Sequence, residues 1–336
     1  MPATALRLVA PAVQQPLEDP ALRPASFDDY IGQRTLIENL KTSVRAAQRG
    51  GWSLDHMLFT GPKGLGKTSI CQVVAAELGA NLRATSAPAI THKGQLASLL
   101  TSLQDGDVLF IDEIHRLAVP LQETLYTAME DRVLDMAAGT KVIRLPLPKF
   151  TLLGATTHAG LLSAPLRDRF GFCYQLTLYS VADLTTIVLR SASKLGVTID
   201  ATGAAEIARR SRGTPRLANR LLRRVRDYVT GTDTRGGLLP QHLVVGEALA
   251  IVALDRLGID GLGLEALDRA YLSFVCQSKA AVGVEAIASA LSEQRQTIED
   301  AVEPFLVQLG FVTRTRKGRV ITDAGIQHLQ GTPGNL

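Results

Sequence analysis

The sequence predicts a doubly wound parallel α/β sheet, followed by a small all-helical domain and a C-terminal winged helix. Up to about residue 178, short apolar runs typical of buried strands alternate with segments of helical periodicity. Beyond Tyr179 the periodicity is purely helical. The last segment combines helical stretches with two short β-like runs around a glycine, which is a winged-helix pattern.

The length of 336 residues supports this division, because it exceeds what one ordinary core holds. We predict a flexible N-terminal arm over residues 1–20, a large α/β domain over 21–180, a helical domain over 181–257 and a winged-helix domain over 258–336. Prolines interrupt the apolar residues of the arm, which makes it a poor signal peptide. The glycines of residues 258–263 break the helical period and predict a linker.

The elements of the large domain follow from their periodicity. Apolar residues at helical spacing, such as Leu40 and Val44, predict an amphipathic helix over residues 33–49. Further helices are predicted over residues 69–78, 94–103 and 120–130, and buried strands over 57–59, 81–85, 108–111, 150–155 and 174–178. Loose alternation between Arg132 and Leu147 predicts a β-hairpin that projects from the domain.

A phosphate-binding loop connects the first strand to the following helix. Residues 61–68 read Gly-Pro-Lys-Gly-Leu-Gly-Lys-Thr, which fits G-x-x-x-x-G-K-[ST] in the required strand–helix setting. The glycines Gly61, Gly64 and Gly66 let backbone N–H groups turn toward a phosphate chain. Lys67 can reach the β- and γ-phosphates, and the Thr68 hydroxyl can ligate Mg²⁺.

Two acids close the apolar strand at residues 108–111. Consecutive strand residues point to opposite sides, so Asp112 can face the metal while Glu113 faces a water molecule. Glu113 fits the group that polarises the attacking water. Thr157, at the end of the strand 150–155, is placed to contact the γ-phosphate or to orient that water. An acidic pair is often only a solvated turn, but beside a phosphate loop it predicts a nucleotide hydrolase.

The helical domain and the winged helix complete the chain. Helices are predicted over residues 181–195, 202–211, 215–228, 241–254, 264–277, 284–291 and 297–309. The helix expected to face DNA is acidic, with Glu299, Asp300 and Glu303, and Pro304 interrupts it, so it suits a major groove poorly.

The wing that follows is basic. It carries Arg314, Arg316, Lys317 and Arg319 with no acid among them. Contacts from such residues to phosphates provide affinity without sequence information, so we expect DNA binding to be independent of sequence.

The overall composition adds few constraints. The formal net charge of +4 permits a polyanionic partner without requiring one. The three cysteines, Cys71, Cys173 and Cys276, are far apart and lack metal-ligand spacing, which predicts reduced core residues in a cytoplasmic protein. No apolar run approaches the length of a membrane span, so we expect no membrane association.

The chain resembles the RuvB family, bacterial AAA+ ATPases that drive branch migration of Holliday junctions. The matching stretches cover essentially everything after the N-terminal arm; examples are Asp-Glu-Ile-His-Arg-Leu at 112–117, Gly-Ala-Thr-Thr at 154–157 and Arg-Gly-Thr-Pro-Arg at 212–216. The resemblance implies an α/β AAA+ ATPase fold with a helical lid. It also implies ATP hydrolysis with Mg²⁺ in a homohexameric ring that translocates duplex DNA during homologous recombination and DNA repair.

The resemblance further implies which residues surround the nucleotide. These are Leu22, Arg23, Gly61, Gly64, Gly66, Lys67, Thr68, Ser69, Tyr179 and Arg216. Leu22 and Arg23 would border the adenine, and Tyr179 would pack where the large domain meets the lid. Thr157 would be the first sensor of the γ-phosphate and Arg216 the second. Most of the other arginines of the same lid helix, which are Arg220, Arg223, Arg224 and Arg226, are expected to be solvated or paired with acids.

Four residues would act at the interface between subunits. Glu130, Asp131 and Arg132 fall where family members contribute contacts to the nucleotide, although Arg132 differs from the residue usually found there. Arg169 would be the arginine finger for a neighbour's ATP, a role worth roughly 10³–10⁵ in rate.

The resemblance also implies partners. Arg295, Arg314 and Arg319 would touch DNA, both duplex and four-way junctions. The protein partners would be a RuvA-like junction-binding protein and a RuvC-like resolvase.

Three departures from the family pattern indicate a divergent member. Lys63 stands where the family has proline, and His158 replaces the arginine that follows the paired threonines. The hairpin between Arg132 and Leu147 is expected to be shorter than in familiar members, where it docks RuvA. The third departure bears most on the RuvA partnership.

Two other interpretations stay open at this point. The first is another AAA+ machine, such as a clamp-loader-like ATPase or a protein remodeller; the basic wing argues against remodelling. The second is an ATP-gated DNA-binding protein with vestigial hydrolysis. Intact Lys67, Asp112, Glu113, Arg169 and Arg216 argue against it, because a vestigial site has no reason to keep all five.

Overall fold

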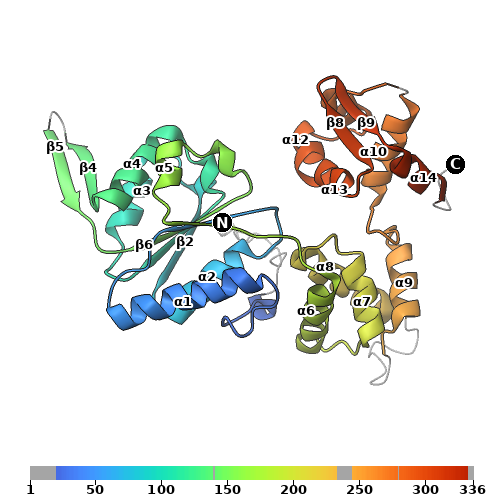
Figure 1. Cartoon of the computed structure of the whole chain (residues 1–336), viewed down its shortest axis with the longest axis horizontal. Helices are drawn as coiled ribbons and strands as arrows, with labels where there is room; N and C mark the ends of the chain where they lie inside the picture. The colour runs from blue at the N-terminus through green and yellow to red at the C-terminus, as the bar shows by residue number, and fades with distance from the viewer. Residues whose placement is uncertain (1–19, 139–140, 233–243, 279, 332–336) are drawn as a thin grey trace, which may run out of the picture.

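The structure is a computed structural model that describes residues 20–138, 141–232, 244–278 and 280–331. It has three parts in chain order: an α/β domain with a projecting hairpin, a group of helices, and a C-terminal domain above that group (Figure 1). The predicted arm over residues 1–20 lies almost entirely outside the described residues.

The α/β domain is built on a five-stranded sheet. Its helices are α1 (Arg34–Gly50), α2 (Lys67–Leu78), α3 (Lys93–Thr101), α4 (Val119–Glu130) and α5 (Ala164–Asp168). Its strands are β1 (Met57–Thr60), β2 (Leu82–Ser86), β3 (Val108–Asp112), β6 (Thr151–Thr156) and β7 (Phe172–Gln175). The order is β2-β3-β6-β1-β7, and every neighbouring pair is parallel, which confirms the predicted sheet.

This strand order brings the carboxyl ends of three strands together at one end of the sheet. β6 lies between β1 and β3, with Thr60 opposite Thr156 and Ile111 opposite Gly154. Because all three strands run the same way, the segments that follow them meet at their carboxyl ends, where ligands bind in sheets of this kind.

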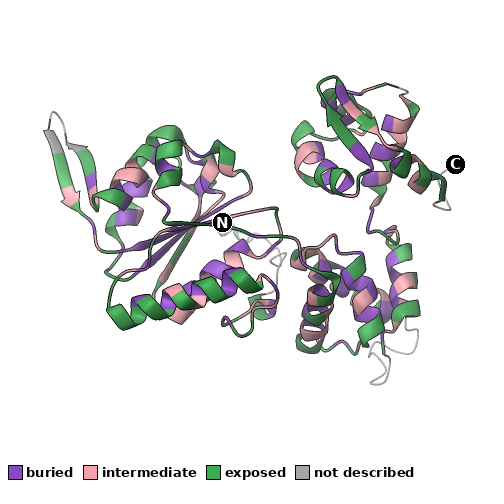
Figure 2. Ribbon diagram, in the orientation of Figure 1, coloured by how far each residue is buried: buried purple, intermediate pink, exposed green. Residues whose placement is uncertain are grey.

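Alternating strand residues supply the two halves of the core, and the central strands β1, β3 and β6 are largely buried (Figure 2). Met57 and Phe59 of β1 pack with residues of α1 and α2, whereas Leu58 packs on the other face with residues of α3 and α4. All three side chains are fully buried. The apolar runs seen in the sequence are therefore the two-sided interior of a covered parallel sheet.

The hairpin consists of β4 (Val133–Ala138) and β5 (Lys141–Pro146), paired antiparallel as predicted. It extends away from the sheet (Figure 1). Residues 139 and 140 of the predicted turn lie outside the described residues.

The lid contains α6 (Val181–Lys194), α7 (Ala201–Arg209), α8 (Pro215–Thr232) and α9 (Glu247–Arg256). The prediction of a helix from residue 241 was wrong: α9 begins at Glu247. Val245 instead forms a parallel bridge with Ile199, and its N–H donates to the Thr198 carbonyl at 2.9 Å. Residues 241–243 lie outside the described residues.

The C-terminal domain has a core of its own. It contains α10 (Ala266–Gln277), α11 (Val284–Ala290), α12 (Arg295–Thr297), α13 (Glu303–Gln308), β8 (Val312–Thr315), β9 (Gly318–Ile321) and α14 (Asp323–Gly331). The predicted helix over 297–309 is irregular, because a π-helical turn, Ile298–Val302, separates α12 from α13. Pro304 follows this turn and lacks the N–H of a regular helix. The helix α14 was not predicted.

The cysteine prediction was right in part. Cys71 is buried and Cys276 is half-buried, but Cys173 is exposed because it lies on β7, an edge strand. Within the described ranges, no helix combines the length and the apolarity that a membrane span needs.

Candidate functional site

The phosphate loop joins β1 to α2 in a conformation that needs glycine. Gly64 and Gly66 have φ angles of 84° and 96°, which residues with a Cβ rarely adopt. Gly66 is the N-cap of α2, and no side chain caps this helix. The first N–H groups of α2 are therefore available to an anion at its positive end.

Lys67 is held at the same loop. Its side chain is 7% exposed, and Nζ donates to the carbonyls of Gly61 at 2.7 Å and Pro62 at 2.8 Å. Burial lowers the pKa of Lys67, and the nearby carboxylates of Glu113 and Asp112 oppose this shift. A buried cation beside a row of N–H groups is suited to a phosphate chain.

Thr68 and Asp112 lie together as expected of a magnesium site. Thr68 Oγ1 donates to Asp112 Oδ2 at 3.4 Å, and Asp112 Oδ1 accepts from the Glu113 N–H at 2.9 Å. One hydroxyl and one carboxylate suit Mg²⁺, which takes few protein ligands and completes its shell with phosphate and water oxygens. Among the described residues, no group of three or more His, Cys, Asp or Glu side chains is arranged to hold another metal.

Glu113 contacts the end of the neighbouring strand. Its Oε2 accepts from Thr157 Oγ1 at 3.2 Å and lies 3.4 Å from His115 Nδ1. Burial lowers the pKa of His115, and the carboxylate of Glu113 opposes this shift. Thr157 Oγ1 is also 2.9 Å from His158 Nδ1. The structure thus brings together the two side chains predicted to orient the water, although Thr157 does not itself line the cleft described next.

A cleft runs along the phosphate loop between the α/β domain and the lid. The predicted residues that line it are Leu22, Arg23, Gly64, Gly66, Lys67, Thr68, Ser69, Asp112, Glu113, Tyr179 and Arg216. Gly61 contributes its carbonyl to Lys67 but does not line the cleft.

Arg216 reaches the cleft because α8 begins against the phosphate loop. Its N–H donates to the Gly64 carbonyl at 3.3 Å, and a Cβ added at Gly64 would lie 3.1 Å from Arg216 Cβ. Tyr179 closes the same junction, with its hydroxyl 3.2 Å from the Leu65 carbonyl. The lid is therefore in direct contact with the loop that would carry the phosphates.

Several lining residues were not predicted. These are Pro24, Tyr30, Ile31, Ile187, Arg190, Pro215, Asn219 and Arg223. Lys63, a cation of the phosphate loop in the sequence, lines the cleft as well. Arg223 is an exception to the solvated or acid-paired face predicted for most of these arginines, whereas Arg220 fits that prediction through its ion pair with Glu265 at 2.5 Å. Helical spacing carried a signal, since Asn219 and Arg223 lie on the face of α8 that bears Arg216.

The residues expected to act between subunits lie elsewhere. None of Glu130, Asp131, Arg132 and Arg169, all of them described, lines the cleft. Arg169 pairs with Glu130 at 2.6 Å, and its Nη2 donates to the Tyr126 hydroxyl at 2.9 Å. Arg169 therefore lies outside the cleft of its own chain.

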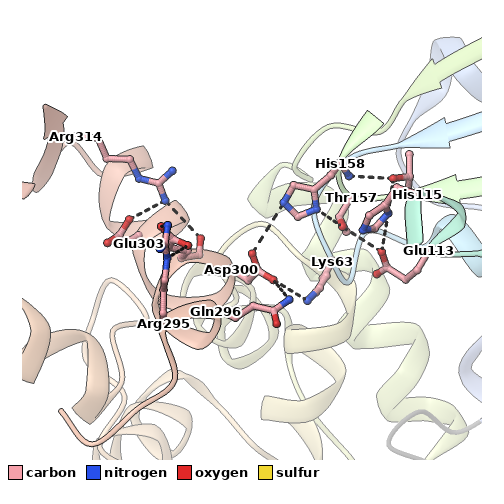
Figure 3. A network of polar contacts seen from close by, with 12 residues as sticks. Lys63, Glu113, His115, Thr157, His158, Arg295, Gln296, Asp300, Glu303 and Arg314 are labelled. Atoms are coloured by element: carbon pink, nitrogen blue, oxygen red, sulfur yellow. Dashed lines mark hydrogen bonds and ion pairs between the residues drawn. The ribbon is translucent and has the colours of Figure 1, made fainter. Parts of the chain in front are cut away.

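The predicted DNA contacts are paired with acids of their own domain (Figure 3). Arg314 lies 2.8 Å from Glu303, Arg295 lies 2.9 Å from Glu299, and Arg319 contacts both carboxylates at 2.8 and 3.1 Å. The side chains of Arg295 and Arg314 are 57% and 49% exposed, whereas that of Arg319 is 15% exposed. The acidic helix thus pairs with two of the four cations of the wing, Arg314 and Arg319, which the sequence did not predict.

Comparisons with known proteins match the whole described chain. Family models described as the Holliday junction DNA helicase RuvB P-loop domain, the RuvB AAA lid domain and the RuvB C-terminal winged helix domain match residues 22–176, 179–260 and 261–330. A Holliday junction branch migration complex subunit RuvB from Paramagnetospirillum magneticum is 48% identical over 333 residues, covering 97% of this chain and 94% of the relative.

Solved structures are similar as well. The Thermotoga maritima RuvB Holliday junction branch migration motor superposes with a TM-score of 0.81 at 40% identity, covering 92% of this chain and 98% of that one. A variant of the same protein superposes with a TM-score of 0.82 at 40% identity, covering 93% and 100%. Identity this high over nearly the entire length shows that the prediction of a divergent member was wrong; Lys63 and His158 are local differences.

Proposed function

Because this chain belongs to the RuvB family, we propose how its own residues perform the family's reaction. The protein is an ATPase motor of Holliday junction branch migration, acting in recombination and DNA repair. The matches to the RuvB lid and winged helix decide against a clamp-loader-like ATPase, a protein remodeller or a gated DNA-binding protein.

The nucleotide site is the cleft at the phosphate loop, which we assign to ATP. Lys67 and the N–H groups of α2 bind the phosphates, and Thr68 with Asp112 would hold Mg²⁺, which neutralises phosphate charge when bound. Glu113 polarises the attacking water, and Thr157 orients Glu113. The observation that carries this assignment is the contact of Glu113 with Thr157 at 3.2 Å, beside the Thr68–Asp112 contact at 3.4 Å.

Further residues of the same chain and one residue of an adjacent subunit complete the nucleotide site. Leu22, Arg23 and Tyr179 border the base. Arg216, at the start of the lid helix α8, contacts the phosphates. Arg169, outside its own cleft, serves as the arginine finger for the next subunit, and Glu130 holds it in place through the 2.6 Å ion pair. Asp131 and Arg132 lie beside Glu130 on the same surface. A finger supplied between subunits requires an adjacent subunit, and a closed ring gives one to every site. We propose a homohexamer for this ring.

DNA binds to the winged helix without reading sequence. Arg295 and Arg314 are half-exposed and can turn from their carboxylate partners to phosphates, because Arg319, which is 15% exposed, stays paired with the buried Glu303 carboxylate that it shares with Arg314. Among the described residues, Arg316 and Lys317 make no ion pair, so they add cationic charge to the wing.

The hairpin is the proposed site for a RuvA-like partner. Met136 and Ile143 face each other across β4 and β5, and they are 38% and 49% exposed. An exposed apolar pair on a projecting hairpin suits a protein interface. A RuvC-like resolvase and a cytoplasmic location belong to the same proposal.

The test is ATP hydrolysis with and without duplex or four-way-junction DNA, with RuvA supplied or withheld. We expect the greatest stimulation with junction and RuvA together, and loss of turnover with retained ATP binding in Glu113→Gln. Met136→Ser with Ile143→Ser should abolish only the stimulation by RuvA. Normal turnover in Glu113→Gln would refute the role of Glu113, and full RuvA stimulation of the double variant would refute the hairpin site.

A further inference from the structure

One acid of the winged-helix domain faces the mouth of the nucleotide site (Figure 3). Asp300 Oδ2 lies 3.6 Å from Lys63 Nζ, and Asp300 Oδ1 lies 4.0 Å from His158 Nε2. Gln296 Nε2 donates to Asp300 Oδ2 at 3.4 Å, which helps to orient the carboxylate. The Asp300 side chain is only 20% exposed. A residue far along the chain therefore joins the winged helix to the α/β domain.

Both of its contacts belong to the ATPase site. Lys63 is part of the phosphate loop and lines the cleft. His158 adjoins Thr157: its Nδ1 is 2.9 Å from Thr157 Oγ1, which in turn donates to Glu113 at 3.2 Å. Asp300 thus faces one edge of the His158 ring while Thr157 contacts the other. Through Lys63, Asp300 is connected to the phosphate loop. Through His158 and Thr157, it is connected to Glu113, the residue proposed to polarise the attacking water.

A bound triphosphate would compete with this contact. The triphosphate and the Asp300 carboxylate are both anions, and both can form an ion pair with the Lys63 ammonium at the phosphate loop. Each therefore weakens the other's hold on Lys63, and such a coupling is reciprocal by thermodynamic necessity. Docking of Asp300 lowers the affinity for ATP, and binding of ATP loosens the docked winged helix.

The segment that carries Asp300 also carries the partners of the DNA-facing arginines. Asp300 lies in the π-helical turn Ile298–Val302, and turns of this kind are frequent at functional sites. Glu299 in the same turn and Glu303 next to it pair with Arg295 and Arg314. The side of the winged helix proposed to meet DNA and the side that meets the nucleotide site therefore share one short segment.

We propose that Asp300 is a positioning residue of the ATPase site, which competes with the triphosphate for Lys63, holds His158 beside Thr157, and so couples nucleotide binding to the position of the winged helix in the same chain. This inference rests on the proposed function of the cleft. Asp300 contacts both Lys63 and His158, which are two of the positions at which this sequence differs from the family pattern.

The experiment measures nucleotide binding to the full-length protein. Asp300→Asn should lower the Kd for ATPγS with Mg²⁺ in titration calorimetry, by about twofold to fivefold, the range set by half-exposed charge pairs. The KM for ATP should fall similarly. The Kd for ADP should change less, because His158 adjoins the proposed sensor of the γ-phosphate. Glu293→Gln, which removes the same charge from an exposed position of the same domain, should leave all three values unchanged.

A double-mutant cycle tests whether Asp300 acts on nucleotide binding through Lys63 and His158. In a Lys63→Gln, His158→Gln background, Asp300→Asn should no longer alter the Kd for ATPγS. An unchanged Kd in Asp300→Asn alone, or an equal decrease in the background lacking Lys63 and His158, would overturn the proposal. Binding is measured without turnover, so these outcomes are independent of whether Glu113→Gln abolishes hydrolysis, which tests the proposed function itself.

Discussion

Replacing Arg319 with methionine tests whether this wing arginine holds DNA or holds its own domain. Arg319 Nε donates to Glu303 Oε1 at 2.8 Å, and its Nη2 donates to Glu299 Oε1 at 3.1 Å. The Glu303 side chain is 0% exposed, and it also accepts from the Tyr271 hydroxyl at 3.0 Å. Burial and the adjacent Glu303 carboxylate raise the pKa of Tyr271, which keeps this donor protonated. Methionine fills much of the same space but leaves Glu303 with one cation fewer.

The magnitude follows from that burial. Removing one partner of a buried ion pair costs about 3–5 kcal/mol. Arg314 and Tyr271 still contact Glu303, so we expect about 3 kcal/mol for Arg319→Met, at the lower end of that range. Arg314→Met is the matched control. Arg314 contacts the same buried carboxylate, but its own side chain is 49% exposed, and Arg319 and Tyr271 would still contact Glu303, so its loss should cost no more than about 1 kcal/mol.

Hydrogen exchange in the full-length protein is the appropriate assay. The single tryptophan, Trp52, lies in the α/β domain, so its fluorescence does not follow the winged helix. A loss of about 3 kcal/mol should speed exchange in the core of residues 261–330 on the order of a hundredfold, with little change in the α/β domain. Wild-type exchange in Arg319→Met, together with weaker duplex binding and a flatter salt dependence, would refute the structural role and show a phosphate contact instead.

Three further predictions concern the other parts of the chain. Arg169→Ala and Lys67→Ala should each abolish turnover, with losses of about 10³–10⁵ for the arginine, yet mixed subunits should regain part of it; no recovery at any ratio would contradict action between subunits. Gly203→Ala should destabilise the lid by about 1–3 kcal/mol in thermal unfolding, because its Cβ would lie 2.3 Å from the Val245 carbonyl oxygen. Gly231→Ala, with no atom within 4 Å, should not destabilise it, and equal losses in both would refute the packing argument. Burial lowers the pKa of His56, whose Nδ1 accepts from the Leu152 N–H at 2.8 Å. Its contribution to stability is therefore present above the ordinary histidine pKa and is lost as pH falls through the lowered folded value. His56→Asn should reduce the acid sensitivity of unfolding between pH 7 and 5, and an unchanged pH dependence would count against this assignment.

The core of the nucleotide site was predictable because its signals are local. Lys67 and Thr68 follow a buried strand within a pattern of eight residues, and Asp112 and Glu113 close another apolar run directly. The carboxyl ends of parallel strands lie at the same end of a sheet, so the predicted sheet already implies that these segments lie close together. The placement of Thr157 beside Glu113 follows from the same rule.

Errors in the predicted elements came from packing between distant segments. The start of α9 at Glu247 depends on a bridge between Val245 and Ile199, and the exposure of Cys173 depends on β7 lying at the sheet edge. The contribution of Arg223 to the cleft depends on which face of α8 turns toward the phosphate loop. Periodicity shows that a helix has faces, but it does not show what each face meets.

By itself, the sequence determined which chemical groups this protein carries: a phosphate loop, an acidic pair that closes a buried strand and a basic wing, each encoded within a few neighbouring residues. Only the tertiary structure decided how these groups are paired. Arg319 forms an ion pair with the buried Glu303 carboxylate. Asp300 of the winged-helix domain contacts Lys63 and His158 of the α/β domain. The physical reason is that ion pairs and domain contacts depend on distances of a few ångströms between residues far apart in the chain, which local spacing does not constrain.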